Sequence, residues 1–348
     1  MGSRRNFLYG SVALGTLWGC TRSENPTVEP PPSLVSLTGA GATLPAPLYF
    51  KWFQEYNKLF PNVQVSYQSI GSVAGVRQFQ TQTVDFGASD VGMTPEEIKQ
   101  VDRGVIMLPV TIGSIVLAYN LPGITDLKLS RATYGELFLG KIKRWNDPLI
   151  QQDNPGMDLP DQEIFVIRRS DASGTTGIFT QHLSAINPEW QERVGSGTAV
   201  EWPEGTIGSR GNEGVTAQVS QQVGTIGYLE STYAMQNKLS TAKLENKSGN
   251  YLRSDTATVT EAISTLELPD NLLGFIPDPP GANAYPIVTY SWILVYKTYN
   301  DSTQSRALKD VLSWCLTTGQ QFAEELSFVP LSSQLVPRVQ SALAQVMP

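Results

Sequence analysis

Three short segments combine glycine with hydroxyl-bearing residues at points where a strand pattern gives way to a helix pattern. They are residues 39–44 (GAGATL), 69–72 (SIGS) and 168–177 (RRSDASGTTG). The first amides of a helix have no intrahelical acceptor and lie at the positive end of the helix dipole, so such residues can cradle an oxyanion. Taken alone, any one segment is more typical of an ordinary helix cap than of an anion site. Together, the three could surround one tetrahedral anion.

Charged residues accompany these segments. Arg169 and Asp171 lie two positions apart, on the same side of an extended chain, so Asp171 can orient Arg169 and partly neutralise it. Asp85 and Asp90 lie around a short strand pattern. Taken alone, Asp90 would be a cap or a solvated turn residue.

Residues that could support other chemistry are scarce. The chain has one histidine, His182, and two cysteines, which leaves little scope for a His-rich or Cys-rich metal site, although an oxygen-ligated metal is formally possible. A serine or cysteine hydrolase would have to be built around His182. We therefore predict no metal site, no cofactor and no catalytic residue.

The elements that must position the anion-binding segments follow an α/β pattern. Residues 34–37 and 63–67 read as strands, and Leu48, Trp52, Tyr56 and Leu59 between them predict a helix with one buried face, which makes a βαβ unit. Further strands are predicted at 105–108, 112–119, 164–168 and 287–296. Thr94 and Ser130 are predicted helix caps, and 305–326 reads as helical with an interruption near Gly319.

Size and charge limit the class of protein. A chain of 348 residues, with 41% hydrophobic and 16% charged residues, is long enough for two lobes with separate cores. Its formal net charge of -7 lacks the basic excess that binding to a phosphate backbone requires. Nucleic acid is therefore not an expected partner.

The N-terminus has the order of an export signal. Arg4 and Arg5 precede an apolar run too short to span a bilayer, so residues 1–19 are predicted to be a signal of twin-arginine or general type. Leu17 to Cys20 resembles a lipoprotein cleavage box, which would acylate Cys20. The alternative is an uncleaved helical anchor. Residues 20–33 are polar and Pro-rich, as expected of an extended tether.

Six collinear motifs resemble one family, the periplasmic phosphate-binding proteins that serve the high-affinity phosphate ABC importer. They are GAGATLPAPLYFKW from Gly39, YQSIGSVAGVRQF from Tyr67, TVDFGASD from Thr83, RRSDASGT from Arg168, GNEGV from Gly211 and GTIGY from Gly224. The likeness covers nearly all of residues 36–330.

The resemblance implies a type II periplasmic binding protein fold, in which two α/β lobes are joined by crossing strands. Residues 34–115 plus 289–348 would form lobe 1, and 116–288 lobe 2. Lobe 1 would offer the ligand Thr43, the Leu44 amide, Ser72 and Asp90; lobe 2 would offer Arg169, Ser173, Gly174 and Thr175, with Asp171 behind Arg169. The implied function is to bind phosphate outside the cytoplasmic membrane, in the periplasm or lipid-anchored at the membrane's outer face, and to deliver it to permease subunits.

The sequence leaves two alternative functions open. Another carrier could bind sulfate, molybdate or tungstate, but sulfate near neutral pH has no proton for a buried carboxylate such as Asp90 to accept, so Asp90 would select for phosphate. An extracytoplasmic phosphatase would also bind phosphate, but it would need a nucleophile with a base or a metal cluster.

Overall fold

The computed structural model describes residues 34–348. The predicted export signal at 1–19 and the predicted tether at 20–33, with Cys20, lie outside these residues. Among helices of the described chain, none has the length and apolar character needed to cross a membrane.

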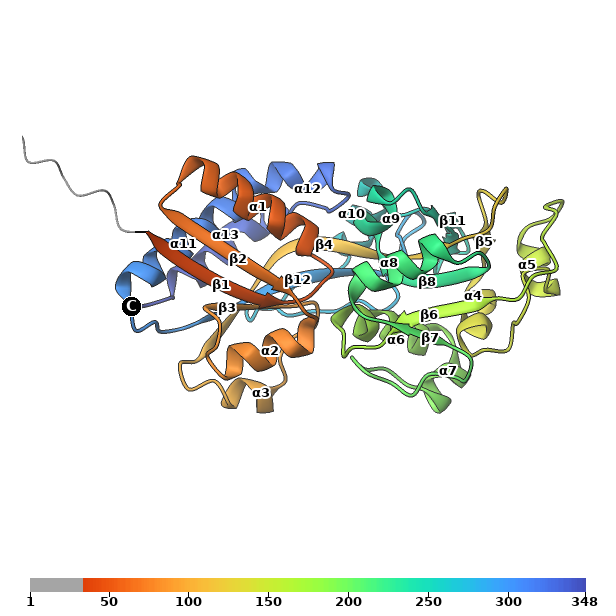
Figure 1. Cartoon of the computed structure of the whole chain (residues 1–348), viewed down its shortest axis with the longest axis horizontal. Helices are drawn as coiled ribbons and strands as arrows, with labels where there is room; N and C mark the ends of the chain where they lie inside the picture. The colour runs from red at the N-terminus through yellow and green to blue at the C-terminus, as the bar shows by residue number, and fades with distance from the viewer. Residues whose placement is uncertain (1–33) are drawn as a thin grey trace, which may run out of the picture. The chain divides into compact units, whose positions relative to one another are not determined.

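A nine-stranded sheet runs through the described part of the chain (Figure 1). Its order is β2-β1-β3-β12-β4-β8-β6-β7, and β9 pairs with β4. The strands are β1 Val35–Gly41, β2 Val63–Ser69, β3 Phe86–Ser89, β4 Val105–Tyr119, β6 Phe165–Arg169, β7 Ile207–Ser209, β8 Thr225–Glu230, β9 Ser240–Thr241 and β12 Val288–Tyr296. A three-stranded sheet of order β11-β10-β5 consists of Tyr251–Leu252, Lys243–Glu245 and Lys128–Leu129.

Strand β4 divides this sheet between two lobes. It pairs with β12 as far as Ser114 and with β8 from Ile115 onward. We call the part built on β1, β2, β3 and β12 the first lobe and the part built on β6, β7 and β8 the second lobe. Figure 1 shows β4 and β12 extending along the line that joins the two. The predicted two-lobed α/β fold with crossing strands is therefore confirmed.

The prediction of two separate strands at 105–108 and 112–119 is wrong, because β4 is continuous across Pro109. Proline has no N–H for a sheet ladder, so inside a sheet it is tolerated at a bulge. The register between β4 and β12 shifts here, with Trp292 opposite Pro109 and Ser291 opposite Thr111. The extra residue, Val110, lets the strand continue past the proline.

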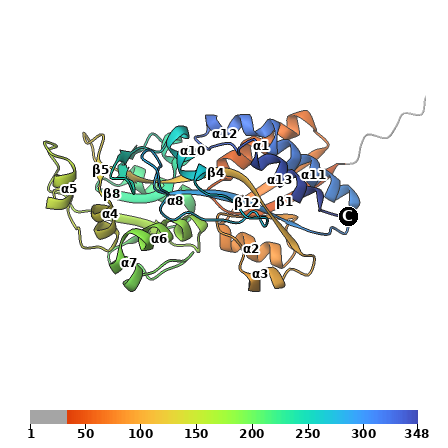
Figure 2. The same cartoon turned by 180° about the vertical axis from the view of Figure 1, so that it is seen from behind.

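Helices cover both faces of each lobe's sheet (Figures 1 and 2). They are α1 Ala46–Leu59, α2 Ser72–Gln80, α3 Pro95–Lys99, α4 Arg131–Phe138, α5 Pro148–Asp153, α6 Gly174–Ile186, α7 Pro188–Arg193, α8 Gly211–Gln221, α9 Ser231–Gln236, α10 Thr256–Ser264, α11 Ser302–Leu316, the 3-10 helix η1 Thr318–Gln320, α12 Gln321–Glu325 and α13 Leu335–Ala344. Because it is covered on both faces, β12 is buried along its whole length, as its apolar sequence requires.

Several local predictions hold. β1 and β2 pair in parallel around α1, so the βαβ unit is confirmed. Thr94 and Ser130 cap α3 and α4 through their side chains. In α1, Leu48, Trp52 and Tyr56 are buried as predicted, but Leu59 is 60% exposed. Leu59 is the last residue of the helix, where the chain turns away before β2.

Candidate anion-binding site between the lobes

The first lobe contributes residues from the ends of two parallel strands and from one helix start. Thr43 and Leu44 follow β1, Asp90 follows β3, and Ser72 is the first residue of α2. The carboxyl ends of β1 and β3 meet at one sheet edge, the usual place for a ligand in an open α/β sheet. The end of β1 passes close to Ala88 of β3, and only a glycine fits there. Gly41 has a φ of 152°, and a β-carbon on it would lie 2.7 Å from the Ala88 nitrogen.

The second lobe contributes the end of β6 and the start of α6. The Ser173 side chain caps α6 by accepting a hydrogen bond from the Thr176 amide at 3.2 Å. Gly174 and Thr175 occupy the first two helical positions. Their amides have no acceptor within the helix, so they are donors for an anion at this helix end.

Arg169 is 2% exposed and held in place by three contacts. Its Nε donates to Asp171 Oδ1 at 2.8 Å, its Nη2 pairs with Asp171 Oδ2, and its Nη1 donates to Thr175 Oγ1 at 3.2 Å. Burial by itself would raise the pKa of Asp171, but the bonds and charge of Arg169 and the Gly211 amide hold that pKa below its usual value. Asp171 therefore holds the guanidinium of Arg169 in place from two sides of its carboxylate.

Arg168 faces away from this cluster, because neighbouring strand residues point to opposite sides. Its guanidinium donates to Thr206 Oγ1 and to the carbonyl oxygen of Arg169.

Asp90 is a carboxylate buried to 1% exposure beside these donors. Its Oδ1 accepts a hydrogen bond from Ser291 Oγ at 2.8 Å, and its Oδ2 accepts one from Ser72 Oγ at 3.3 Å. Burial raises the pKa of Asp90 to about 6, although the Ser291 bond, the charge of Arg169 and the Ser72 bond oppose this rise. Asp90 is therefore ionised at neutral pH, and its pKa lies only about one unit below neutrality.

Two glycines allow the lobes to meet at the site. A β-carbon at Gly174 would lie 2.7 Å from the β-carbon of Asp90 and 2.8 Å from its Oδ2. At Gly71, where φ is 98°, a β-carbon would lie 2.7 Å from Asp171 Oδ2. The predicted residues of the two lobes that make these contacts thus converge on one buried interface. Leu44 follows Thr43 in the chain and is fully buried.

Two further residues contact the predicted ones but were not predicted from the sequence. Asn212, at the start of α8, donates from Nδ2 to Thr43 Oγ1 at 2.7 Å and to Thr175 Oγ1 at 3.2 Å. It lies in the motif GNEGV, so the motif offered a signal for it. Ser291, the partner of Asp90, lies in a fully buried strand, and no sequence pattern distinguishes it from its neighbours.

The charges define what the site can hold. Arg169 is balanced by Asp171, and Asp90 adds a negative charge. An anion must therefore be held mainly by hydroxyls, amides and helix N-termini, which supply partial positive charge. An anion that carries a proton can also donate to Asp90. The arrangement fits a tetrahedral oxyanion that retains at least one hydrogen.

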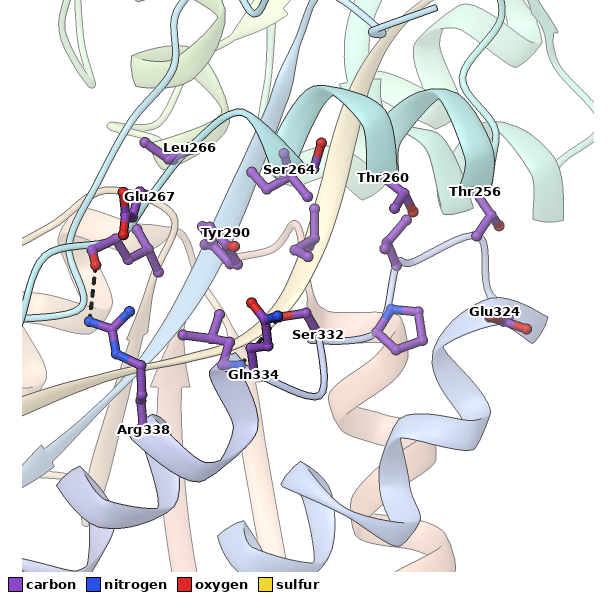
Figure 3. Close-up of a pocket in the computed structure, with 16 residues that line it drawn as sticks. Thr256, Thr260, Ser264, Leu266, Glu267, Tyr290, Glu324, Ser332, Gln334 and Arg338 are labelled. Atoms are coloured by element: carbon purple, nitrogen blue, oxygen red, sulfur yellow. Dashed lines mark hydrogen bonds between the residues drawn. The ribbon is translucent and has the colours of Figure 1, made fainter.

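Two other places do not offer this chemistry. His182 is buried in contact with the Tyr134 hydroxyl and the Pro277 carbonyl oxygen, and burial lowers its pKa to about 4. A groove of about 680 Å³ lies between α10 and α13 (Figure 3). Its one arginine, Arg338, donates from Nη2 to the carbonyl oxygens of Leu268 and Pro269.

Across residues 34–348, no cluster of His, Cys, Asp or Glu could hold a metal ion.

Comparisons with known proteins agree on one family. Residues 21–318 match the family model of the PBP superfamily domain. The chain is 41% identical over 311 residues to the phosphate-binding protein PstS of Pasteurella multocida, covering 88% of this chain and 89% of that protein. It is 38% identical over 335 residues to the PstS of Methanocaldococcus jannaschii, covering 89% and 86%.

Solved structures share the fold at lower identity. A high-affinity periplasmic phosphate-binding protein solved with phosphate has a TM-score of 0.74 at 20% identity and covers 89% of this chain and 93% of its own. A putative phosphate ABC transporter substrate-binding protein from Clostridium perfringens, also with bound phosphate, has a TM-score of 0.64 at 16% identity, covering 85% and 100%. With this fold and the sequence identities above, the chain belongs to the PstS family of phosphate-binding proteins.

Proposed function

We propose that this protein binds inorganic phosphate between its lobes, through Thr43, Leu44, Ser72 and Asp90 of the first lobe and Arg169, Ser173, Gly174 and Thr175 of the second. The two lobes would be residues 34–115 plus 289–348 and residues 116–288. Asp171 would keep Arg169 in position. The hydroxyls of Thr43, Ser173 and Thr175 and the amides at the helix ends would donate to the phosphate oxygens, while the Ser72 hydroxyl donates to Asp90.

The main support for phosphate as the ligand is the burial of Asp90 within an anion site. A carboxylate repels an anion that has no proton, whereas it accepts a hydrogen bond from one that has. Ser291 and Ser72 hold the two Asp90 oxygens, so a fully deprotonated oxyanion such as sulfate would face a like charge. The site therefore favours phosphate over sulfate, and neither alternative interpretation from the sequence gains support from the comparisons.

The protein is a substrate-binding protein of phosphate transport and not an enzyme. It acts outside the cytoplasm and delivers phosphate to an ABC importer, whose permease subunits are its protein partners. This assignment draws on the names of the PstS relatives and on the neighbour named as a phosphate ABC transporter component.

We also propose that a lipid holds the protein at the membrane. Residues 1–19 would direct export, Cys20 would be acylated, and 20–33 would connect the anchor to the folded body. The support is the order of charged and apolar residues before Cys20 and the Pro-rich composition after it.

Calorimetric titration tests the binding proposal. The purified protein is titrated with phosphate, sulfate and molybdate at pH 7 and pH 8. We expect saturable binding of phosphate at both pH values and much weaker binding of sulfate and molybdate. Equal affinity for sulfate and phosphate would contradict the proposal that Asp90 selects for phosphate.

A further inference from the structure

Asn212 is a fully buried side chain of the second lobe that contacts both lobes. Its Nδ2 donates to Thr43 Oγ1 of the first lobe at 2.7 Å and to Thr175 Oγ1 of the second at 3.2 Å. These contacts use both hydrogens of its side-chain amide. Asn212 thus lies between two threonines of the proposed phosphate site.

Both threonine oxygens receive a second donor. The backbone amide of Asn212 donates to Thr43 Oγ1 at 3.2 Å, and Arg169 Nη1 donates to Thr175 Oγ1 at 3.2 Å. A hydroxyl oxygen has two acceptor positions and one hydrogen. Each threonine oxygen therefore has both acceptor positions filled, by groups that cannot accept its hydrogen in return.

The orientation of the Asn212 amide is fixed from its other end. Its Oδ1 accepts a hydrogen bond from the Glu230 backbone amide at 3.0 Å. A flipped side chain would set the NH2 group against this N–H and leave the Glu230 amide unsatisfied in a buried region. The NH2 group must therefore face Thr43 and Thr175.

We propose that Asn212 is a positioning residue that makes the Thr43 and Thr175 hydroxyls donors to the bound anion. The inference rests on the proposed phosphate function and concerns the same site. With both hydroxyls fixed as donors, neither can accept a hydrogen from phosphate. Asp90 is then the acceptor for the ligand's proton, and the hydroxyls add only donors around it.

A double-mutant cycle read by calorimetry with phosphate tests the proposal. Asn212→Ala is measured in the wild-type chain and in the Thr43→Val, Thr175→Val chain. In the wild-type chain we expect the Kd to rise roughly tenfold to hundredfold, because two hydroxyls lose their fixed direction toward the anion. In the double-valine chain the same substitution should change the Kd by no more than about twofold.

Two further variants control for a general loss of structure. Asn246 is a fully buried asparagine whose Nδ2 donates to the carbonyl oxygens of Gly281, Ala282 and Ala284. Asn246→Ala should lower thermal stability without changing the Kd. If Asn212→Ala does not fold, Asn212→Asp takes its place, because it keeps the shape but accepts both hydroxyl hydrogens. Its effect should again be much larger in the wild-type than in the double-valine chain.

The outcomes distinguish a failure of the role of Asn212 from a failure of the proposed phosphate binding. A wild-type chain that binds phosphate, with equal losses in both backgrounds, would overturn the role of Asn212 alone. A wild-type chain that does not bind phosphate would overturn the proposed function and this inference with it.

Discussion

The Ser291 hydroxyl donates a hydrogen bond of 2.8 Å to Oδ1 of Asp90 across the neighbouring strands β12 and β3. This bond occupies one carboxylate oxygen from inside the first lobe. The other oxygen, Oδ2, faces Ser72 and the start of α6. Ser291 thus orients Asp90 so that a single oxygen is presented to the space between the lobes.

Glu230 is a second buried acid, and its titration should be visible in the stability of the ligand-free protein. Burial raises its pKa to about 8, against the bonds it accepts from Ser231 and Thr232. The folded protein keeps this proton while the unfolded chain loses it, so stability falls as the pH rises from about 4.5 and levels off above about 8.

Glu230→Gln should remove this loss of folding stability with rising pH. We expect chemical denaturation to show little difference from wild type at pH 5, and a variant more stable by about 2–4 kcal/mol at pH 9. A difference that stays constant between these pH values would mean that Glu230 is not protonated in the folded protein at neutral pH.

Arg169→Ala and Arg168→Ala form a matched pair. Arg169→Ala removes the buried guanidinium and leaves Asp171 unpaired, so phosphate binding should weaken by about 3–5 kcal/mol. Arg168 points to Thr206, so its alanine variant should stay within about 0.5 kcal/mol of wild type. Titration calorimetry measures both, and equal losses would overturn the placement of Arg169.

Gly174→Ala tests the close approach of the lobes. A methyl group there would lie against Ser72 and Asp90, and overpacking of this kind costs about 1–3 kcal/mol. We expect phosphate affinity to fall by about that amount, because the two lobes can no longer approach as closely at the site. Gly214→Ala in α8 is the control, because its nearest neighbour would be 3.5 Å away. Equal loss of phosphate affinity in both variants would mean that the loss does not come from the contact between the lobes at Gly174.

Cys20→Ser tests the proposed anchor. The variant should move from the membrane fraction to the soluble fraction without a change in phosphate affinity, because the tether would separate the anchor from the folded body. Fractionation of cells that express each form provides the measurement. A signal-processed variant that stays in the membrane fraction would contradict acylation at Cys20.

Much of the fold could be predicted because local patterns and global structure agree. The caps at Thr94 and Ser130 and the buried face of α1 each follow from side-chain chemistry within a few residues. The continuity of β4 could not, because Pro109 normally ends a strand. Its tolerance depends on the bulge opposite Ser291 and Trp292, about 180 residues away in the chain.

In the site, too, some residues can be recognised from the local sequence, whereas their contacts cannot. Thr43, Ser72 and Ser173 stand out locally as hydroxyls near helix starts. The contacts that fix their roles are distant in the sequence: Asn212 reaches Thr43 over 169 positions, and Ser291 reaches Asp90 over 201. Only the folded chain shows that the hydroxyl of Ser173 caps α6, while that of Ser72 bonds Asp90.

Competition of labelled phosphate by excess sulfate, in wild type and Asp90→Asn at pH 8 and pH 5, measures whether Asp90 selects for an anion that carries a proton. Because the pKa of Asp90 is about 6, the wild-type site should exclude sulfate at pH 8 and admit it at pH 5, where the protonated carboxyl can donate. Asp90→Asn should admit sulfate at both pH values, since an amide can donate to an oxygen that a carboxylate repels. If neither the substitution nor the pH changes the ratio of sulfate affinity to phosphate affinity, Asp90 does not select for the proton of the ligand.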